Sequence, residues 1–248
     1  VNSVQKVYDF NAAFGGPLIA NRLWFFAAAR RWGTTTGVAN LFADTSVADF
    51  VYLPDTGAPI EPDESNKGIG GRLTYQATSK DKFTFSWDKQ RNFQDQLTGQ
   101  LETGTVKNEA NPGYCQRHEV IQGTWSRPQS NNFLFDGGIT VSKFNFGGFG
   151  KDVFLSDYEG CGGGIQDNVS INDTGLGFTY NGVGNRTMSL SHQSNGRVNV
   201  SMIKGQHNVK TGVFWMYGLG GGHRTYTERG PTQVNELPVS YTFTSGVP

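Results

Sequence analysis

No long hydrophobic run occurs in the 248 residues of this chain, and that absence excludes the commonest kind of membrane segment. A transmembrane helix needs about 18 or more consecutive apolar residues. The most apolar stretch, LWFFAAA at residues 23–29, is far too short for that. Hydrophobic residues make up only 36% of the chain and the mean hydropathy is negative, so we expect no helical membrane protein.

Net charge is also lacking, because 21 basic residues balance 21 acidic ones. No basic stripe indicates a nucleic-acid partner, and no acidic tail indicates a disordered interaction segment. Residues 1–17 lack the basic end and apolar core of a signal peptide. The protein is therefore expected to be either cytoplasmic or an internal piece of a longer chain, and we favour the second.

Glycine and phenylalanine are abundant, with 34 and 18 copies, which favours many strands and turns. Segment 72–91 predicts a hairpin, because Phe83, Phe85 and Trp87 alternate with polar residues after a polar turn at 79–81. Segments 119–143 and 197–217 predict two more hairpins, with turns at 128–131 and 204–206. The connections at 33–66, 92–117, 146–196 and 218–238 are long and rich in Gly, Asn, Asp and Pro.

Long and short connections thus alternate along the chain, and long ones are uncommon in compact soluble domains. An outer-membrane β-barrel shows this alternation, because its periplasmic turns are short and its extracellular loops are long. Segment 21–32 is then best interpreted as an upward strand, with Leu23, Phe25, Ala27 and Ala29 on one face. The alternative is an Ala-rich helix, but neither a cap nor a 3.6-residue period supports it.

The segment DFNAAFGGPLIANRLWFFAAARRW, 9–32, resembles the junction between plug and first barrel strand in Oar-like TonB-dependent outer-membrane receptors. KGQHNVKTGVFWMY, 204–217, is similar to a hairpin of that family, and ELPVSYTF, 236–243, fits the strand that returns after the next loop. The residues that carry the resemblance are Asn11, Gly15, Gly16, Pro17, Leu18, Asn21, Arg22, Trp24, Phe25, Phe26, Gly205, His207, Val209, Lys210 and Gly212.

The resemblance implies an all-β fold, an antiparallel transmembrane barrel of about 22 strands filled by an N-terminal plug. About eight crossings are expected here, which is the first third of such a barrel. Residues 1–20 would be the plug-to-barrel junction and 21–248 a partial barrel, with the plug and the C-terminal strands outside this sequence. The implied partners are the outer-membrane lipid bilayer, an external solute and, through the plug, the TonB complex.

Cys115 and Cys161 are the only cysteines, and the topology puts both in long loops on the external side. The cell surface permits disulfides, so we expect a Cys115–Cys161 bond, with two unpaired cysteines as the alternative. Cys115 and His118 could begin a zinc site, but no second ligand pair completes it. We expect neither a metal site nor a cofactor.

Three further groups of residues can each be interpreted as functional or as ordinary parts of the structure. The carboxylates of the third long loop could hold Ca²⁺, although a solvated loop is the simpler interpretation; they are Asp152, Asp157, Glu159, Asp167 and Asp173. Aromatic residues could form an interfacial girdle, or instead the core of a β-sandwich; they are Tyr75, Trp87, Trp125, Trp215 and Tyr217. Polar residues that alternate with them would face a plugged or water-filled interior; they are Arg72, Thr74, Gln76, Lys82, Thr84, Ser86, Asp88, Gln122, Thr124, Asp136, Thr140, Asn199, Ser201 and Lys210.

The histidines His118, His192, His207 and His223 share no local spacing, and no catalytic motif occurs. We therefore expect no enzyme, but a receptor in the outer membrane of a Gram-negative bacterium that imports an external solute with energy from the inner membrane. The alternatives are a small passive or adhesive eight-stranded barrel and a soluble extracellular carbohydrate-binding β-domain. The sequence does not identify the substrate.

Overall fold

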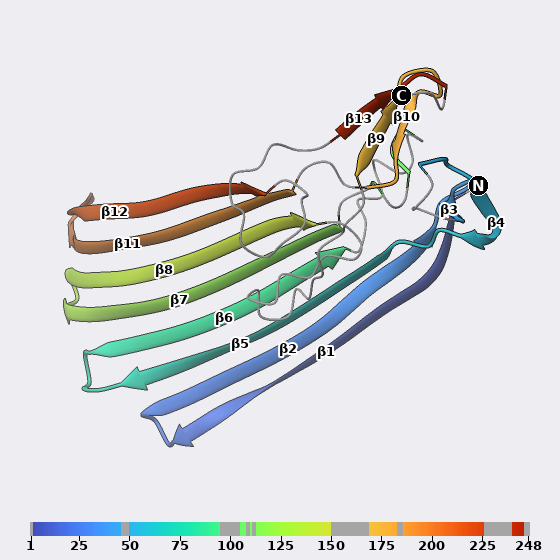
Figure 1. Cartoon of the computed structure of the whole chain (residues 1–248). Coiled ribbons are helices and arrows are strands. Elements are labelled where there is room, and N and C mark those ends of the chain that lie inside the picture. Colours follow the sequence, from blue (N-terminus) through green and yellow to red (C-terminus); the bar gives the residue numbers. More distant parts are fainter. Residues whose placement is uncertain are drawn as a thin grey trace.

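The computed structural model describes residues 2–45, 50–94, 105–107, 110, 113–149, 169–182, 186–225 and 240–245. These residues are all-β, and eight strands form one antiparallel sheet in which every strand pairs with its predecessor in that sheet (Figure 1). The strands are β1 Ser3–Ile19, β2 Leu23–Gly37, β5 Asp63–Gln76, β6 Lys82–Gln94, β7 Gly113–Ser130, β8 Phe133–Phe149, β11 Arg186–Lys204 and β12 His207–Thr225. In this described part, no helix is long and apolar enough to span a membrane.

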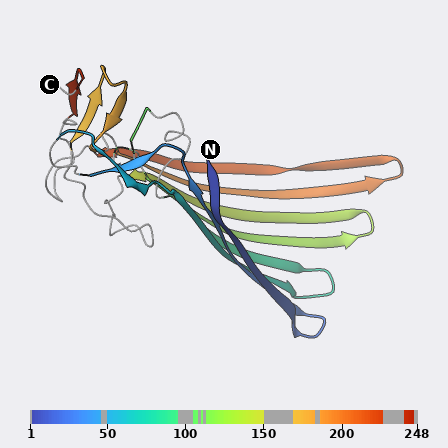
Figure 2. The same cartoon turned by 90° about the vertical axis from the view of Figure 1, so that its right-hand side faces the viewer.

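The sheet is open among the described residues, with β1 at one edge and β12 at the other. Figure 2 shows it as a curved, twisted layer whose two edges do not meet. Twist of this kind is the ordinary consequence of the right-handed twist of each strand. The expected eight-stranded antiparallel sheet is therefore confirmed, whereas a closed barrel is not formed.

Four short turns lie together at one end of the sheet (Figure 1). Asn21 and Gly205 adopt positive φ angles of 57° and 62°, which Asn and Gly tolerate better than other residues. The predicted turns at 79–81 and 204–206 are confirmed. The turn predicted at 128–131 is wrong, because β7 continues through Pro128 to Ser130, past an irregular register, and the chain turns at Asn131 and Asn132.

The strands of the large sheet contain 13 to 19 residues. They are longer than the single strands that the alternation of apolar and polar residues predicted within each hairpin. Residues 33–37, 63–66, 113–117, 186–196 and 218–225 belong to strands, although the sequence places them in loops. The backbone ladder continues there, while most of the residues are polar or glycine and apolar residues such as Leu190 and Leu219 occur singly. A ladder of backbone hydrogen bonds needs no apolar face, so the two-residue period had no signal in these segments.

Strand β1 comes from the segment that the resemblance assigns to a junction. Its residues pair with β2 from Ser3 opposite Gly37 to Ile19 opposite Leu23, with two irregularities, at Val4/Lys6 and Pro17/Ile19. Residues 3–19 are thus the first strand of the sheet, and the turn at 20–22 leads from it into β2. A function of this segment as a plug junction stays a prediction.

The described segments of the long connections lie at the opposite end of the sheet from the turns and form short strands of their own (Figure 1). These are β3 Phe42–Asp44, β4 Pro54–Pro59, β9 Ser170–Asp173, β10 Phe178–Tyr180 and β13 Ser240–Phe243. The expectation that 236–243 returns as a crossing strand is wrong for its described part. Strand β13 instead pairs parallel with β9, in a three-stranded sheet of order β10-β9-β13.

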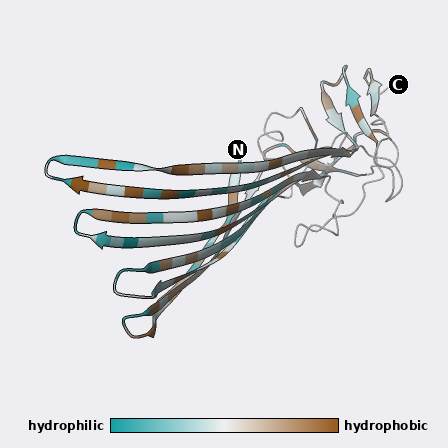
Figure 3. Cartoon of the chain, turned by 90° about the vertical axis from the view of Figure 1, so that its left-hand side faces the viewer, coloured by the Kyte–Doolittle hydropathy of each residue, from teal (hydrophilic) through white to brown (hydrophobic). Residues whose placement is uncertain are grey.

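Buried apolar residues gather at this loop end and not on the large sheet. Val38, Leu41 and Ile60 form one cluster, and Ile171, Tyr180 and Phe243 form another. Large apolar side chains of the sheet are exposed instead, for example Phe85 at 49% and Leu73 at 43%. Figure 3 shows hydrophobic residues recurring along the strands in the half nearest the short turns.

Candidate functional site

One face of the large sheet is polar over most of its width. In an antiparallel ladder, residues directly opposite each other point to the same face. The register joins Arg72, Ser86, Gln122, Thr140 and Asn195 in one such row across five strands. The polar residues expected to share an interior face all fall in rows of this face, so their grouping is confirmed.

Hydrogen bonds and ion pairs link polar side chains across neighbouring strands of this face. Gln122 Nε2 donates to Thr140 Oγ1 at 3.0 Å, and Asn199 Nδ2 donates to Asp136 Oδ2 at 2.8 Å. Asp136 also faces Lys210 Nζ at 3.5 Å, so this carboxylate connects β8 with β11 and β12. Such links give the polar groups partners and fix the strand register.

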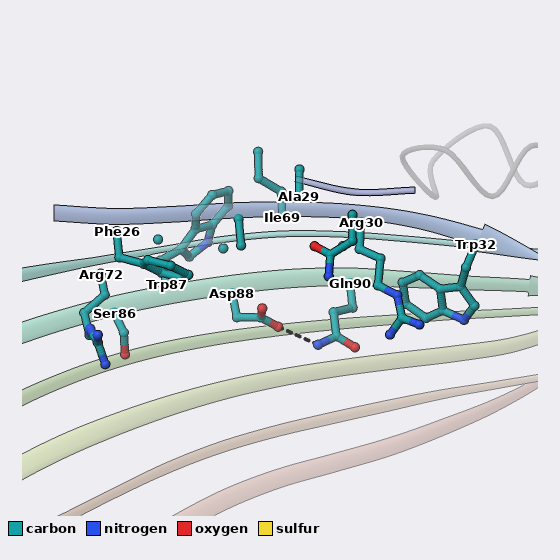
Figure 4. Close-up of a pocket in the computed structure, with 15 residues that line it drawn as sticks. Phe26, Ala29, Arg30, Trp32, Ile69, Arg72, Ser86, Trp87, Asp88 and Gln90 are labelled. Atoms are coloured by element: carbon teal, nitrogen blue, oxygen red, sulfur yellow. Dashed lines mark hydrogen bonds between the residues drawn. The ribbon is translucent and has the colours of Figure 1, made fainter. Parts of the chain in front are cut away.

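A hollow of about 580 Å³ lies on strands β2, β5 and β6 and reaches Asn11 of β1 (Figure 4). Its wall combines cationic, acidic, amide and aromatic side chains; those that define its character are Phe26, Arg30, Trp32, Arg72, Asp88 and Gln90. Glycines at 68 and 70 leave its floor open, because no side chain rises from them on this face. Pockets with a few convergent polar groups and aromatic walls are typical of binding sites.

Arg30 is the best-fixed side chain of this hollow. Its Nε and Nη2 donate to the two oxygens of Asp9 at 2.9 and 2.6 Å, which makes a two-pronged pair between β1 and β2. Its guanidinium also lies 4.6 Å from the ring centroid of Trp32. Arg72 and Asp88 line the same hollow, and Asp88 accepts a hydrogen bond from Gln90 at 2.9 Å. This arrangement can bind a polar ligand or a polar chain segment.

Among the described residues, the hydrogen bonds assemble no catalytic triad and no group of metal ligands. His118 Nε2 lies 3.0 Å from Ser142 Oγ, a pairing that the sequence spacing did not suggest. The neighbouring Phe144 ring packs edge-on against His118, with centroids 6.0 Å apart. These contacts position a polar group on the same face, in the row that also carries Gln90.

The opposite face carries the apolar residues. Tyr75, Trp87, Trp125, Trp215 and Tyr217 all lie on it, and the register places them in the rows of Phe83, Ile121 and Ile139. The Trp215 ring covers Gly196, where an added Cβ would lie 2.0 Å from the ring. The expected aromatic residues therefore share one face, but that face has no second layer in the described residues and is no sandwich core.

The long connections fold together into a cap at the loop end. Tyr180 Oη donates to the Phe50 carbonyl at 3.0 Å, and the Phe178 and Tyr180 rings pack against Tyr52. Burial, aided by the nearby charges of Asp173 and Asp44, raises the pKa of the Tyr180 hydroxyl above its usual value. Phe243 closes the cluster from the far end of the chain. Segments from separate loops thus share one small core, which the sequence patterns did not indicate.

Asp173 is the expected calcium-loop carboxylate that lies among the described residues, and it is fully buried. Its Oδ1 accepts backbone hydrogen bonds from Gly175, Leu176 and Ser245 at 2.8 to 2.9 Å. This oxygen therefore stabilises a turn rather than facing a cation. Asp152, Asp157, Glu159 and Asp167 lie outside the described residues.

Cys115 lies at the loop end of β7 and is 2% exposed. It is disulfide-bonded. Cys161, the only other cysteine of the chain, lies outside the described residues. The bonded state of Cys115 agrees with the expected Cys115–Cys161 bridge, whose far end stays a prediction.

No protein-family model, no curated protein and no solved structure matches this chain. The functional argument therefore depends on the sheet, its two faces and its loop end.

Proposed function

We propose that this chain is the N-terminal part of the barrel of an Oar-like, TonB-dependent outer-membrane receptor, which binds an external solute and imports it. One observation carries the proposal. An eight-stranded antiparallel meander has an apolar face and a polar face, with short turns at one end and long, folded connections at the other. A transmembrane β-barrel has these same asymmetries.

The apolar face supports a lipid environment. Single exposed apolar residues are ordinary, but large contiguous apolar patches on soluble proteins mark sites that something else covers. Here the exposed residues include Leu73 on β5, Phe83 and Phe85 on β6, and Ile139 on β8, and the register joins Leu73, Phe85 and Ile139 in one row. Strands of 13 or more residues exceed the 9–11 residues or so that a tilted crossing needs.

The open edges of the sheet favour a barrel of more than eight strands over a complete eight-stranded barrel. A complete eight-stranded barrel would pair its first strand with its last, which removes both edges. Strands β1 and β12 instead end the sheet on opposite sides. In the proposed receptor, further strands continue from these edges, and a plug contacts the polar face with the hollow around Arg30 and Arg72.

In this mechanism no bond is made or broken by the chain. The cap presents the loop end to the outside, where a solute first binds, and the polar face provides hydrogen-bonding groups along the path or against the plug. Energy would reach the plug through the TonB complex, an element that the family resemblance implies.

Reconstitution into lipid vesicles tests the membrane part of the proposal. The full-length protein that contains this chain should need detergent, should stay in vesicles during alkaline carbonate and urea washes, and should give infrared dichroism for strands tilted about 35–45°. A chain that stays monomeric in buffer without detergent would instead support the soluble β-domain. The transport part is tested in the native cell, where deletion of the gene should abolish uptake of one solute to the same extent as loss of TonB.

A further inference from the structure

A row of four cations crosses the apolar face of the sheet at its loop side. Arg31 on β2 pairs directly with Lys67 on β5, Lys67 pairs with Arg91 on β6, and Arg91 pairs with Arg117 on β7. Directly opposed residues share a face, so the four side chains leave the sheet on the same side. We call Arg31, Lys67, Arg91 and Arg117 the cationic row.

Like charges directly opposite each other destabilise a sheet, and here three successive pairs are like-charged. Arg31 and Arg117 lie near enough to Arg91 to repel its charge. The next row toward the turns differs, because Glu119 stands between Lys89 and Lys143 and alternates the sign. An anion that binds several cations at once would relieve the repulsion within the cationic row.

The surface is hollowed at this row. A hollow of about 470 Å³ is lined by Lys67, Lys89, Arg91 and Arg117, together with Gly68, Ile69 and Gln90. Lys67 and Lys89 are exposed, while Arg91 and Arg117 are half-buried. Three members of the cationic row, Lys67, Arg91 and Arg117, therefore converge with Lys89 of the next row on one concavity large enough for a phosphate-bearing group.

The row also marks the border of the apolar band on the same face. Ile69 follows Lys67 by two residues, Trp87 precedes Arg91 by four, and Ile121 follows Arg117 by four, all on the turn side. Trp87 Nε1 donates to Glu119 Oε1 at 2.8 Å, as expected for a tryptophan between apolar and polar surroundings. A ligand seated on the row thus has apolar protein surface directly beside it.

We propose that the cationic row binds the phosphate headgroup of an anionic lipid, whose acyl chains lie along the apolar band. Arginine forks match phosphate oxygens in a two-pronged geometry, and phosphate is the headgroup chemistry that four converging cations select. A lipid fits better than a soluble anion because the apolar band begins within two to four residues of each cation. This inference rests on the proposed insertion of the apolar face into a membrane.

The test uses the full-length protein that contains this chain, in vesicles of phosphatidylcholine, with energy transfer from its tryptophans to dansyl-labelled lipid as the readout. Dansyl-phosphatidylglycerol should associate more tightly than dansyl-phosphatidylcholine. The variant R91Q/R117Q should lower the affinity for the anionic lipid about 10- to 30-fold, since each basic residue near an anionic surface contributes roughly a fivefold factor. The matched variant K80Q/K82Q removes two cations at the turn end and should leave the affinity unchanged.

Membrane insertion is measured in the same vesicles by resistance to carbonate washing. Two results would overturn the cationic row as a lipid site while the proposed function remains: inserted protein that binds both lipids with equal affinity, or an equal loss of affinity in the two double variants. Chain that washes off the vesicles overturns both proposals. If inorganic phosphate displaces the anionic lipid at millimolar concentration, the row is a site for soluble phosphate and the lipid assignment is wrong.

Discussion

Arg127 on β7 contacts Asp81 in the β5–β6 turn, with Nη1 3.1 Å from Asp81 Oδ2. Trp125 Nε1 donates to Asp81 Oδ1 at 3.0 Å, and Thr78 Oγ1 donates to Oδ2 at 2.7 Å. One carboxylate thus orders its own turn and attaches it to the strand beyond β6. The turn end of the sheet is held by side chains as well as by the backbone ladder.

Asp81→Asn should lower the stability of the folded chain and abolish part of its acid sensitivity. Hydrogen bonds from Thr78 and Trp125 and the charge of Arg127 hold the pKa of Asp81 below its usual value. A depressed carboxyl pKa adds stability above the unfolded pKa of about 3.8, and this stability is lost as the pH falls toward the folded value. Urea unfolding of both proteins at pH 7 and between pH 4 and 2 measures the difference.

The stability gap between wild type and Asp81→Asn should narrow as the pH falls through that window. Asp55→Asn is a suitable control, because this exposed carboxylate accepts only a local bond from Gly57 N at 2.9 Å. A gap that stays constant down to pH 2 would contradict a role for the Asp81 charge.

Gly196→Val should destabilise the pairing of β11 with β12. A Cβ at position 196 would lie 2.0 Å from the Trp215 ring, so the ring must leave its place on the apolar face. Overpacking of this kind costs roughly 1–3 kcal/mol. Tryptophan fluorescence during urea unfolding should report both the lower midpoint and an altered emission of Trp215.

Gly220→Val is the matched control for this substitution, since no atom lies within 4 Å of a Cβ built there. Equal destabilisation by both variants would mean that loss of strand glycine, and not the Trp215 contact, causes the effect.

Cys115→Ser should lower the free energy of unfolding by about 4 kcal/mol, because the predicted bond to Cys161 closes a loop of about 45 residues. The non-reduced, denatured wild type should contain no reactive thiol, and Cys115→Ser should contain one. Thiol titration with and without reductant checks this directly. Two reactive thiols in the non-reduced wild type would contradict the bridge.

Asp173→Ala should loosen the loop-end cap and leave the large sheet intact. The substitution removes the acceptor of three backbone N–H groups and leaves donors unpaired, which costs about 1–3 kcal/mol. Hydrogen exchange should accelerate at 171–180 and 241–245 and stay unchanged at 83–87. Faster exchange throughout β6 would mean that cap and sheet unfold as one unit.

The hairpins and the two faces could be predicted because they have a local signal. Phe83, Phe85 and Trp87 alternate with polar residues, and this two-residue period fixes which face each side chain takes. Strand β1 was harder to identify, since Gly15, Gly16 and Pro17 look like a break. In the structure they pair with β2 at an edge, where the missing amide hydrogen of proline is tolerated.

The cap and the cationic row could not be predicted from local sequence patterns. Tyr180 and Phe50 are 130 residues apart, and β13 pairs with β9 across 70 positions, so neither contact has a sequence period. The cationic row appears only when the register of four strands is known, because Arg31, Lys67, Arg91 and Arg117 are each unremarkable along their own strands.

The pairing order has a consequence for how the chain folds. Every strand of the large sheet pairs with its predecessor in that sheet, so the sheet can grow hairpin by hairpin as the chain emerges, with low loop-closure cost within each hairpin. The cap cannot form that way, because its core needs residue 243 beside residue 171. Folding therefore has a built-in direction, in which the loop end is completed only after the last of the eight strands is in place.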